Sequence, residues 1–135
     1  MDIAGIIRSA RVIAVVGLSD KPERPSYDVA SYMAGHGYMI IPVNPMIKEW
    51  KGLKAYGSLS EIPPGMKVDI VDIFRKSEDV PPVVDEAIKI GAGTVWMQLG
   101  IVNEEAAARA RDAGLDVVMD RCLKIEHGRL GGDGP

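Results

Sequence analysis

The sequence has a single cysteine, Cys122, and few aromatic side chains, with one phenylalanine among 135 residues. A single cysteine excludes an internal disulfide and is typical of a protein of the reducing cytoplasm. Aromatic residues amount to 5%, and the formal charge is −3 with no run of basic residues. Nucleic-acid-binding modules are normally basic and offer rings for stacking, so this class of protein is not expected.

Long apolar runs are also lacking. No stretch reaches the roughly 18 uncharged residues that a membrane helix needs, and the N-terminus has no signal-peptide pattern. We therefore expect a cytoplasmic protein without membrane contact. The composition, 47% hydrophobic and 26% charged, is that of an ordinary globular protein. We expect one domain over residues 1–127 and a frayed Gly-rich tail over 128–135.

Short apolar runs alternate with helical patterns along the whole chain. Strands are predicted over 12–16, 38–43, 53–56, 68–74, 94–99 and 115–119. Helices are predicted from Asp2, from near Ser26, from Pro81 or Pro82, from Asn103 and from Asp120. This alternation predicts an α/β fold with a doubly wound parallel sheet.

Ligands of such a sheet bind beyond the carboxyl ends of its strands. The residues at those positions are 17–26, Asn44-Pro45, Phe74 to Lys76, Gln98 to Ile101 and Asp120 to Cys122.

The loop after the first strand lacks the G-x-G-x-x-G pattern of dinucleotide-binding proteins. Gly17 lets the chain leave the strand sharply, and a helix begins near the end of the loop. The amides of a helix N-terminus favour a phosphate, for which Lys21 or Arg24 would supply positive charge. Alternatively, both cations pair with Asp20 and Glu23 in solvent.

Asn44 follows the second strand, where NAD enzymes normally have a carboxylate that binds the ribose. A carboxylate would repel a phosphate on the ribose, whereas a neutral amide would not. The position therefore favours a ribose-phosphorylated nucleotide over plain NAD. An Asn-Pro turn that simply ends the strand is the alternative.

Other residues at strand ends have a binding and a structural interpretation. Phe74 packs on an adenine or on the core, and Arg75 binds phosphate or holds its loop. Gln98 offers a donor and an acceptor to a polar ligand, and Gly100 allows close approach of a ligand or forms a tight turn.

Cys122 is expected in the first turn of the last helix, where the helix N-terminus and Arg121 favour the thiolate; a small apolar filler is the alternative. His36 is expected to be a capping or surface residue, and no function is expected for His127. No carboxylate pair, metal-ligand spacing or Ser-His-Asp set is visible.

Taken together, several segments resemble the single-domain CoA-binding proteins, which are similar to the N-terminal CoA-binding domain of the succinyl-CoA synthetase α subunit. The resemblance covers residues 12–127. Its segments are Val16 to Ser19, Lys21 to Tyr27, Pro42 to Pro45, Asp72 to Arg75, Trp96 to Gly100 and Met119 to Cys122.

The resemblance implies a Rossmann-like fold that binds coenzyme A. By position, the phosphates would contact Gly17, Leu18, Ser19, Lys21, Arg24 and Ser26. Val43, Asn44 and Pro45 would border the adenosine 3′-phosphate, Phe74 and Arg75 the nucleotide, and Gln98 and Gly100 the pantetheine arm. The phosphorylated histidine of the synthetase lies in a further domain, so ligase activity is not expected.

Three functions follow. The first is binding of CoA or acyl-CoA without catalysis, by a homodimer or with a partner subunit; in one form of it, Cys122 makes a mixed disulfide with the CoA thiol. The second is an NAD(P)-binding domain of a small oxidoreductase or redox sensor. The third is the CoA-binding subunit of a split acyl-CoA ligase.

Overall fold

The computed structural model describes residues 2–131. In this part of the chain, five parallel strands form a sheet with the order β2-β1-β5-β6-β7. These strands are β1 (Val12–Val16), β2 (Met39–Val43), β5 (Ile70–Ile73), β6 (Thr94–Met97) and β7 (Asp116–Val118). The prediction of a single-domain α/β fold with a doubly wound, Rossmann-like sheet is confirmed.

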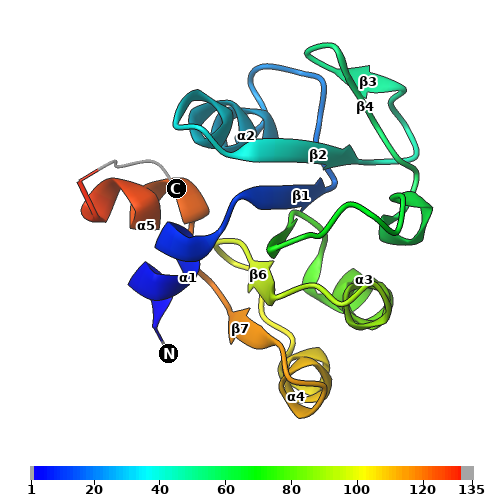
Figure 1. The fold of residues 1–135 in the computed structure, drawn as a ribbon, viewed down its shortest axis with the longest axis vertical. Coiled ribbons are helices and arrows are strands. Elements are labelled where there is room, and N and C mark those ends of the chain that lie inside the picture. Colours follow the sequence, from blue (N-terminus) through cyan, green and yellow to red (C-terminus); the bar gives the residue numbers. More distant parts are fainter. Residues whose placement is uncertain (1, 132–135) are drawn as a thin grey trace.

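Helices cover both faces of the sheet. They are α1 (Ile3–Ser9), α2 (Pro25–Gly35), α3 (Val80–Lys89), α4 (Glu104–Asp112) and α5 (Leu123–Arg129), with short 3-10 helices η1 (Leu59–Glu61) and η2 (Ser77–Asp79). Helices α1, α2 and α5 lie on one face and α3 and α4 on the other (Figure 1).

The core consists of two clusters, one under each helical layer. In β1, Ala14 and Val16 belong to the cluster under α3 and α4, whereas Ile13 and Val15 belong to the cluster under α1, α2 and α5. Because side chains alternate between the faces of a strand, a strand covered on both sides needs apolar residues at every position. This explains the uninterrupted apolar run of β1.

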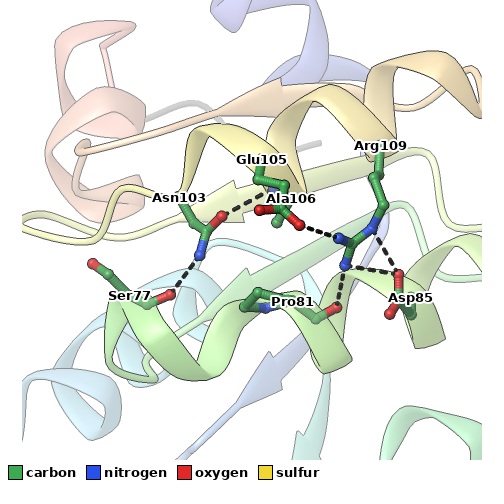
Figure 2. Close-up of polar contacts among 7 residues, drawn as sticks. All are labelled: Ser77, Pro81, Asp85, Asn103, Glu105, Ala106 and Arg109. Carbon is green, nitrogen blue, oxygen red and sulfur yellow. Dashed lines mark hydrogen bonds and ion pairs between the residues drawn. The ribbon is translucent and has the colours of Figure 1, made fainter.

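Polar contacts fasten α4 to α3 and its preceding turn (Figure 2). The side-chain oxygen of Asn103 caps α4, as predicted, while its Nδ2 donates to the carbonyl of Ser77 at 2.9 Å. Further along α4, Arg109 pairs with Asp85 at 3.1 Å and donates to the carbonyl of Pro81 at 3.4 Å. Asn103 therefore joins the segments that follow β5 and β6.

The prediction of a strand of the main sheet over 53–56 is wrong. Strands β3 (Glu49–Trp50) and β4 (Leu53–Lys54) form a separate antiparallel hairpin. The two residues between them, Lys51 and Gly52, have φ values of 49° and 80°, as the two-residue turn of a tight hairpin requires. Only Tyr56 reaches the parallel sheet, through one bridge to Val43.

The last helix begins later than predicted, at Leu123 and not at Asp120. Asp120 has a φ of 57°, which is not helical, and its carboxylate accepts a hydrogen bond from the amide of Gly100 at 2.7 Å. Cys122 is therefore the N-cap of α5 and not part of its first turn. The expected tail begins inside α5, which ends at Arg129, and residues 132–135 lie outside the described part of the chain.

Candidate functional site

A cavity of about 730 Å³ lies at the carboxyl edge of the sheet. Its lining comes from the segments that follow β1, β2, β5, β6 and β7, and from α2 and α5. Nine of the thirteen predicted site residues line it, namely Gly17, Ser19, Lys21, Arg24, Ser26, Asn44, Phe74, Arg75 and Gln98. Its volume lies within the range of small-molecule and cofactor sites, about 300–1,000 Å³.

Gly17 allows β1 to approach the end of β5 closely. Its φ is 87°, and a Cβ at this position would lie 2.8 Å from the carbonyl oxygen of Phe74 and 3.5 Å from Cζ of Arg75. A side chain at residue 17 would therefore be strained by the backbone and would collide with the next strand. The glycine brings the loop after β1 next to Arg75.

The loop after β1 is folded by its own hydroxyl groups. The hydroxyl oxygen of Ser26 accepts from the amide of Ser19 at 3.0 Å, and the hydroxyl oxygen of Ser19 accepts from the amide of Lys21 at 3.1 Å. The amides of Ser19 and Lys21 are thus used inside the loop. Since a hydroxyl also donates, both serines retain an O–H for a ligand.

Helix α2 directs unbonded amides to this loop. Its N-cap, Arg24, makes no side-chain capping hydrogen bond. Among the described residues, the amides of Ser26 and Tyr27 have no hydrogen-bond acceptor. Because Ser26 lines the cavity, the first turn of this eleven-residue helix offers N–H groups and the positive end of the helix dipole to an anion.

Three cationic side chains, Lys21, Arg24 and Arg75, also line the cavity. Within residues 2–131 none of the three lies within 4.0 Å of a carboxylate. The alternative in which Lys21 and Arg24 pair with Asp20 and Glu23 is therefore not seen in this structure. The loops after β1 and β5 carry a positive charge that an anion would neutralise.

Asn44 ties the end of β2 to the loop after β1. Its Nδ2 donates to the carbonyl of Leu18 at 3.0 Å, and its Oδ1 accepts from the amide of Met46 at 2.9 Å. The side chain is therefore held by backbone on both sides, and one N–H of its amide remains for a ligand. Asn44 therefore forms the turn that ends β2, which was the structural alternative, and its side chain also lines the cavity.

Gln98 and Asp72 form a buried pair at the ends of β6 and β5. Nε2 of Gln98 donates to Oδ1 of Asp72 at 2.6 Å. Asp72 is fully buried and Gln98 is 4% exposed. Burial raises the pKa of Asp72 to about 7, and the hydrogen bond from Gln98 opposes this rise. Among residues 2–131, the Oδ2 atom of Asp72 finds no hydrogen-bond partner.

Four predicted site residues do not line the cavity. The side chains of Leu18 and Val43 are buried in opposite core clusters. Pro45 is exposed outside the lining, and the amide of Gly100 is bonded to Asp120. The neighbours of Gly100, Leu99 and Ile101, line the cavity in its place.

The residues that sequence reasoning missed lie on helices. Val29 of α2 and Ile125 of α5 line the cavity together with the half-buried Cys122. Val29 belongs to the apolar face of α2, which the sequence pattern indicates. Ile125 reaches the cavity because α5 packs beside α2, and the sequence pattern does not show this packing. The segments after β6 and β7 thus make an apolar part of the cavity, whereas those after β1 and β5 make a cationic part.

Other chemistry is not visible in this site. Within residues 2–131, no group of three His, Cys, Asp or Glu side chains can hold a metal ion, and no helix is long and apolar enough to span a membrane. His36 is the C-cap of α2, and His127 is buried beside Tyr32, whose hydroxyl lies 2.9 Å from its Nδ1. Neither histidine lines the cavity.

Fold and site together define a Rossmann-like α/β domain with a cavity that is cationic in one part and apolar in the other. The chain belongs to the CoA-binding domain family, whose model matches residues 11–128.

Two similar proteins span nearly the whole chain. An uncharacterised protein of Bacillus subtilis (strain 168), YneT, is 46% identical over 126 residues, which are 93% of this chain and 92% of YneT. The structure of a hypothetical protein from Pyrococcus horikoshii OT3 is 44% identical, has a TM-score of 0.92, and is matched over 97% of this chain and 91% of that chain.

A third relative is much longer. The α subunit of acetate–CoA ligase (ADP-forming) II of Pyrococcus furiosus is 36% identical over 67 residues. The match covers 49% of this chain and 15% of the ligase subunit. The related segment is therefore a small part of that protein.

Proposed function

We propose that this protein binds coenzyme A or an acyl-CoA in the cavity and performs no catalysis of its own. The observation that supports this most directly is that one cavity has both a cationic part and an apolar part in its lining. Three cations and the first amides of α2, which have no partner in the described part of the chain, suit phosphates, while Leu99, Ile101 and Ile125 suit an apolar arm. The family match agrees with such a ligand.

In this proposal the phosphates bind at the loop after β1. Ser19, Lys21, Arg24 and Ser26 contact them through hydroxyl, charge and amide groups, and Arg75 approaches from the end of β5. The backbone of Gly17 and Leu18 shapes this loop.

The rest of the molecule follows the carboxyl edge of the sheet. The adenosine 3′-phosphate lies near Asn44, with Val43 and Pro45 bordering it, and Phe74 flanks the nucleotide. The pantetheine arm passes Gln98 and Gly100 toward the segment after β7. A cytoplasmic location is part of the proposal. A chain with a single cysteine is typical of the reducing cytoplasm, and the thiol of CoA also stays reduced there.

Calorimetric titration with CoA, dephospho-CoA, NAD and NADP tests this proposal. We expect CoA to bind, dephospho-CoA to bind more weakly because it lacks the 3′-phosphate, and NAD to bind weakly or not at all. Binding of NAD without CoA would favour the oxidoreductase alternative. Equal affinities for CoA and dephospho-CoA would refute the assignment of Asn44 to the 3′-phosphate.

A split acyl-CoA ligase is a second candidate, because a relative is named as a ligase α subunit. In that case a separate ATP-binding chain would co-purify with this protein, and only the pair would form acetyl-CoA from acetate, ATP and CoA. The protein alone is expected to form none, since neither histidine of the described chain lines the cavity. Acetyl-CoA formation by the purified chain would contradict the non-catalytic proposal.

A further inference from the structure

The side-chain amide of Gln98 is nearly buried, and only its NH₂ group makes a hydrogen bond among the described residues. Its backbone is fixed, since its amide donates to the carbonyl of Ile73 at 3.3 Å and its carbonyl accepts from Ile101 at 2.8 Å. Its Nε2 donates to Asp72. Among residues 2–131 no donor lies within hydrogen-bond distance of its Oε1, although the side chain is 4% exposed and lines the cavity. The unused group is therefore an acceptor at the cavity wall.

Asp72 decides which end of the Gln98 amide is unused. When Asp72 is ionised, its carboxylate can only accept hydrogen bonds, so the NH₂ group of Gln98 faces it and the carbonyl oxygen faces away, as in this structure. No ion pair reaches Asp72 from the described residues, and its neighbours on the adjacent strands, Val15 and Trp96, are apolar. Gln98 is thus the one side chain that hydrogen-bonds Asp72 in this part of the chain.

Stability does not explain a carboxyl group at this position. A buried acid with one oxygen lacking a partner lowers the stability of the fold, and groups of this kind concentrate at functional sites. An apolar residue would fill the same place between Val15 and Trp96 without that cost.

We propose that Asp72 is a positioning residue that holds the amide of Gln98 so that its Oε1 accepts a hydrogen bond from an amide N–H of the pantetheine arm. The inference rests on the proposed CoA-binding function. Of the parts of CoA, the pantetheine arm is the one that has secondary amides, which are donors of this kind. A phosphate offers mainly acceptors and would be repelled at this wall, whereas Lys21, Arg24 and Arg75 would attract it.

The test compares two ligands on three variants: Asp72→Asn, Gln98→Leu and the double variant. The ligands are CoA and adenosine 3′,5′-bisphosphate, which has the nucleotide phosphates but no pantetheine arm. In Asp72→Asn the new amide can donate to Oε1 of Gln98 as well as accept from its Nε2, so residue 72 no longer holds the carbonyl oxygen of Gln98 toward the ligand. We expect each single variant to bind CoA about tenfold more weakly, the effect of one lost hydrogen bond.

Bisphosphate binding should change less than about twofold in all three variants, which also shows that the cavity is intact. The double variant should bind CoA no more weakly than Gln98→Leu, because Asp72 acts only through Gln98. Unchanged CoA affinity in Asp72→Asn, equal losses for both ligands, or additive losses in the double variant would overturn this inference while CoA binding by the wild type stands. Absence of CoA binding by the wild type would overturn the proposed function and this inference with it.

Discussion

Gly17 is the residue at which the chain after β1 comes nearest to the end of β5. A methyl group there would meet the carbonyl oxygen of Phe74 at 2.8 Å in addition to the strain of a φ of 87°. Gly91 has a similar φ of 73°, but no atom of residues 2–131 lies within 4 Å of the position that its Cβ would take. A substitution at Gly91 therefore measures the cost of backbone strain alone, whereas one at Gly17 measures strain together with the collision with Phe74.

We expect Gly17→Ala to lower the free energy of unfolding by about 2–4 kcal/mol, and Gly91→Ala by about 1 kcal/mol. Gly17→Ala should also weaken CoA binding, because the loop after β1 must move away from Arg75. Urea denaturation and calorimetry would measure both effects. Equal losses of stability in the two variants would show that the contact with Phe74 is unimportant.

Arg75 and Lys76 are adjacent cations with different surroundings. Arg75 is half-buried and lines the cavity, whereas Lys76 is exposed outside it. We expect Arg75→Gln to reduce CoA affinity by about tenfold or more, since a charge-assisted hydrogen bond contributes about 1.5–3 kcal/mol. Lys76→Gln, which removes the same charge, should change the affinity less than about twofold. Comparable losses in both variants would indicate a general charge effect rather than a contact by Arg75.

The raised pKa of Asp72 makes the stability of the fold depend on pH. Burial raises this pKa from 3.8 to about 7, so the folded protein keeps the proton that the unfolded chain loses above pH ~4. The stabilising contribution is complete below the unfolded pKa and is lost as pH rises from ~4 to ~7.

We expect the free energy of unfolding of the wild type to fall by about 2.5–3 kcal/mol between pH ~5 and pH ~8, relative to Asp72→Asn. The slope is about 1.4 kcal/mol per unit of pH below the folded pKa and levels off above it. Asp72→Asn cannot titrate at this position, so it corrects for all other groups. Urea denaturation at both pH values measures the difference. Parallel pH profiles for the two proteins would contradict the raised pKa.

At the scale of elements, the beginning of α4 stabilises the wall of the cavity. Asn103 caps this helix and bonds the carbonyl of Ser77, while the hydroxyl oxygen of Ser77 accepts from the amide of Val102 at 3.1 Å. The two segments joined in this way follow directly on Arg75 and Ile101, which line the cavity. The residue that caps α4 therefore also links two segments that line the cavity, through the contact between Asn103 and Ser77 (Figure 2).

We expect Asn103→Ala to destabilise the protein by about 1–2 kcal/mol, because it removes both the cap and the link to Ser77. Asn103→Ser keeps a capping oxygen but cannot reach Ser77, and should lose about half as much. Chemical denaturation gives the free energies of unfolding. Equal losses in Asn103→Ser and Asn103→Ala would mean that the cap contributes nothing.

At the scale of the whole molecule, the cavity collects residues from most of the sheet. The strand order places β1 and β5 side by side, with β6 and β7 beyond them, so the cationic and apolar segments follow one another along the carboxyl edge. A ligand that fills the cavity would contact the segments after all five strands of the sheet, together with α2 and α5. Its binding should therefore stabilise the fold as a unit.

We expect CoA at about one hundred times its dissociation constant to raise the free energy of unfolding by about 2.7 kcal/mol, because it binds the folded state alone. The corresponding rise in melting temperature is measured by differential scanning calorimetry. NAD at the same concentration should cause little change, and the Arg75→Gln variant should need more CoA for the same rise. A larger rise with NAD than with CoA would contradict the proposed function.

Much of the fold could be predicted from the sequence because its signals are local. The apolar run of β1, the cap at Asn103 and the prolines that begin α3 each specify an element from neighbouring residues. The Lys51-Gly52 hairpin escaped prediction, since lysine seldom has a positive φ.

The sequence by itself determined the alternation of strands and helices, and with it the edge of the sheet at which the cavity lies. Tertiary structure alone decided which side chains at that edge reach the cavity. It buried Leu18 and Val43 in the core, brought Ile125 to the same cavity as Val29, and paired Gln98 with Asp72 across 26 residues of chain. The physical reason is that spacing along a chain fixes the period of an element, whereas the register of strands and the packing of helices fix which distant side chains meet.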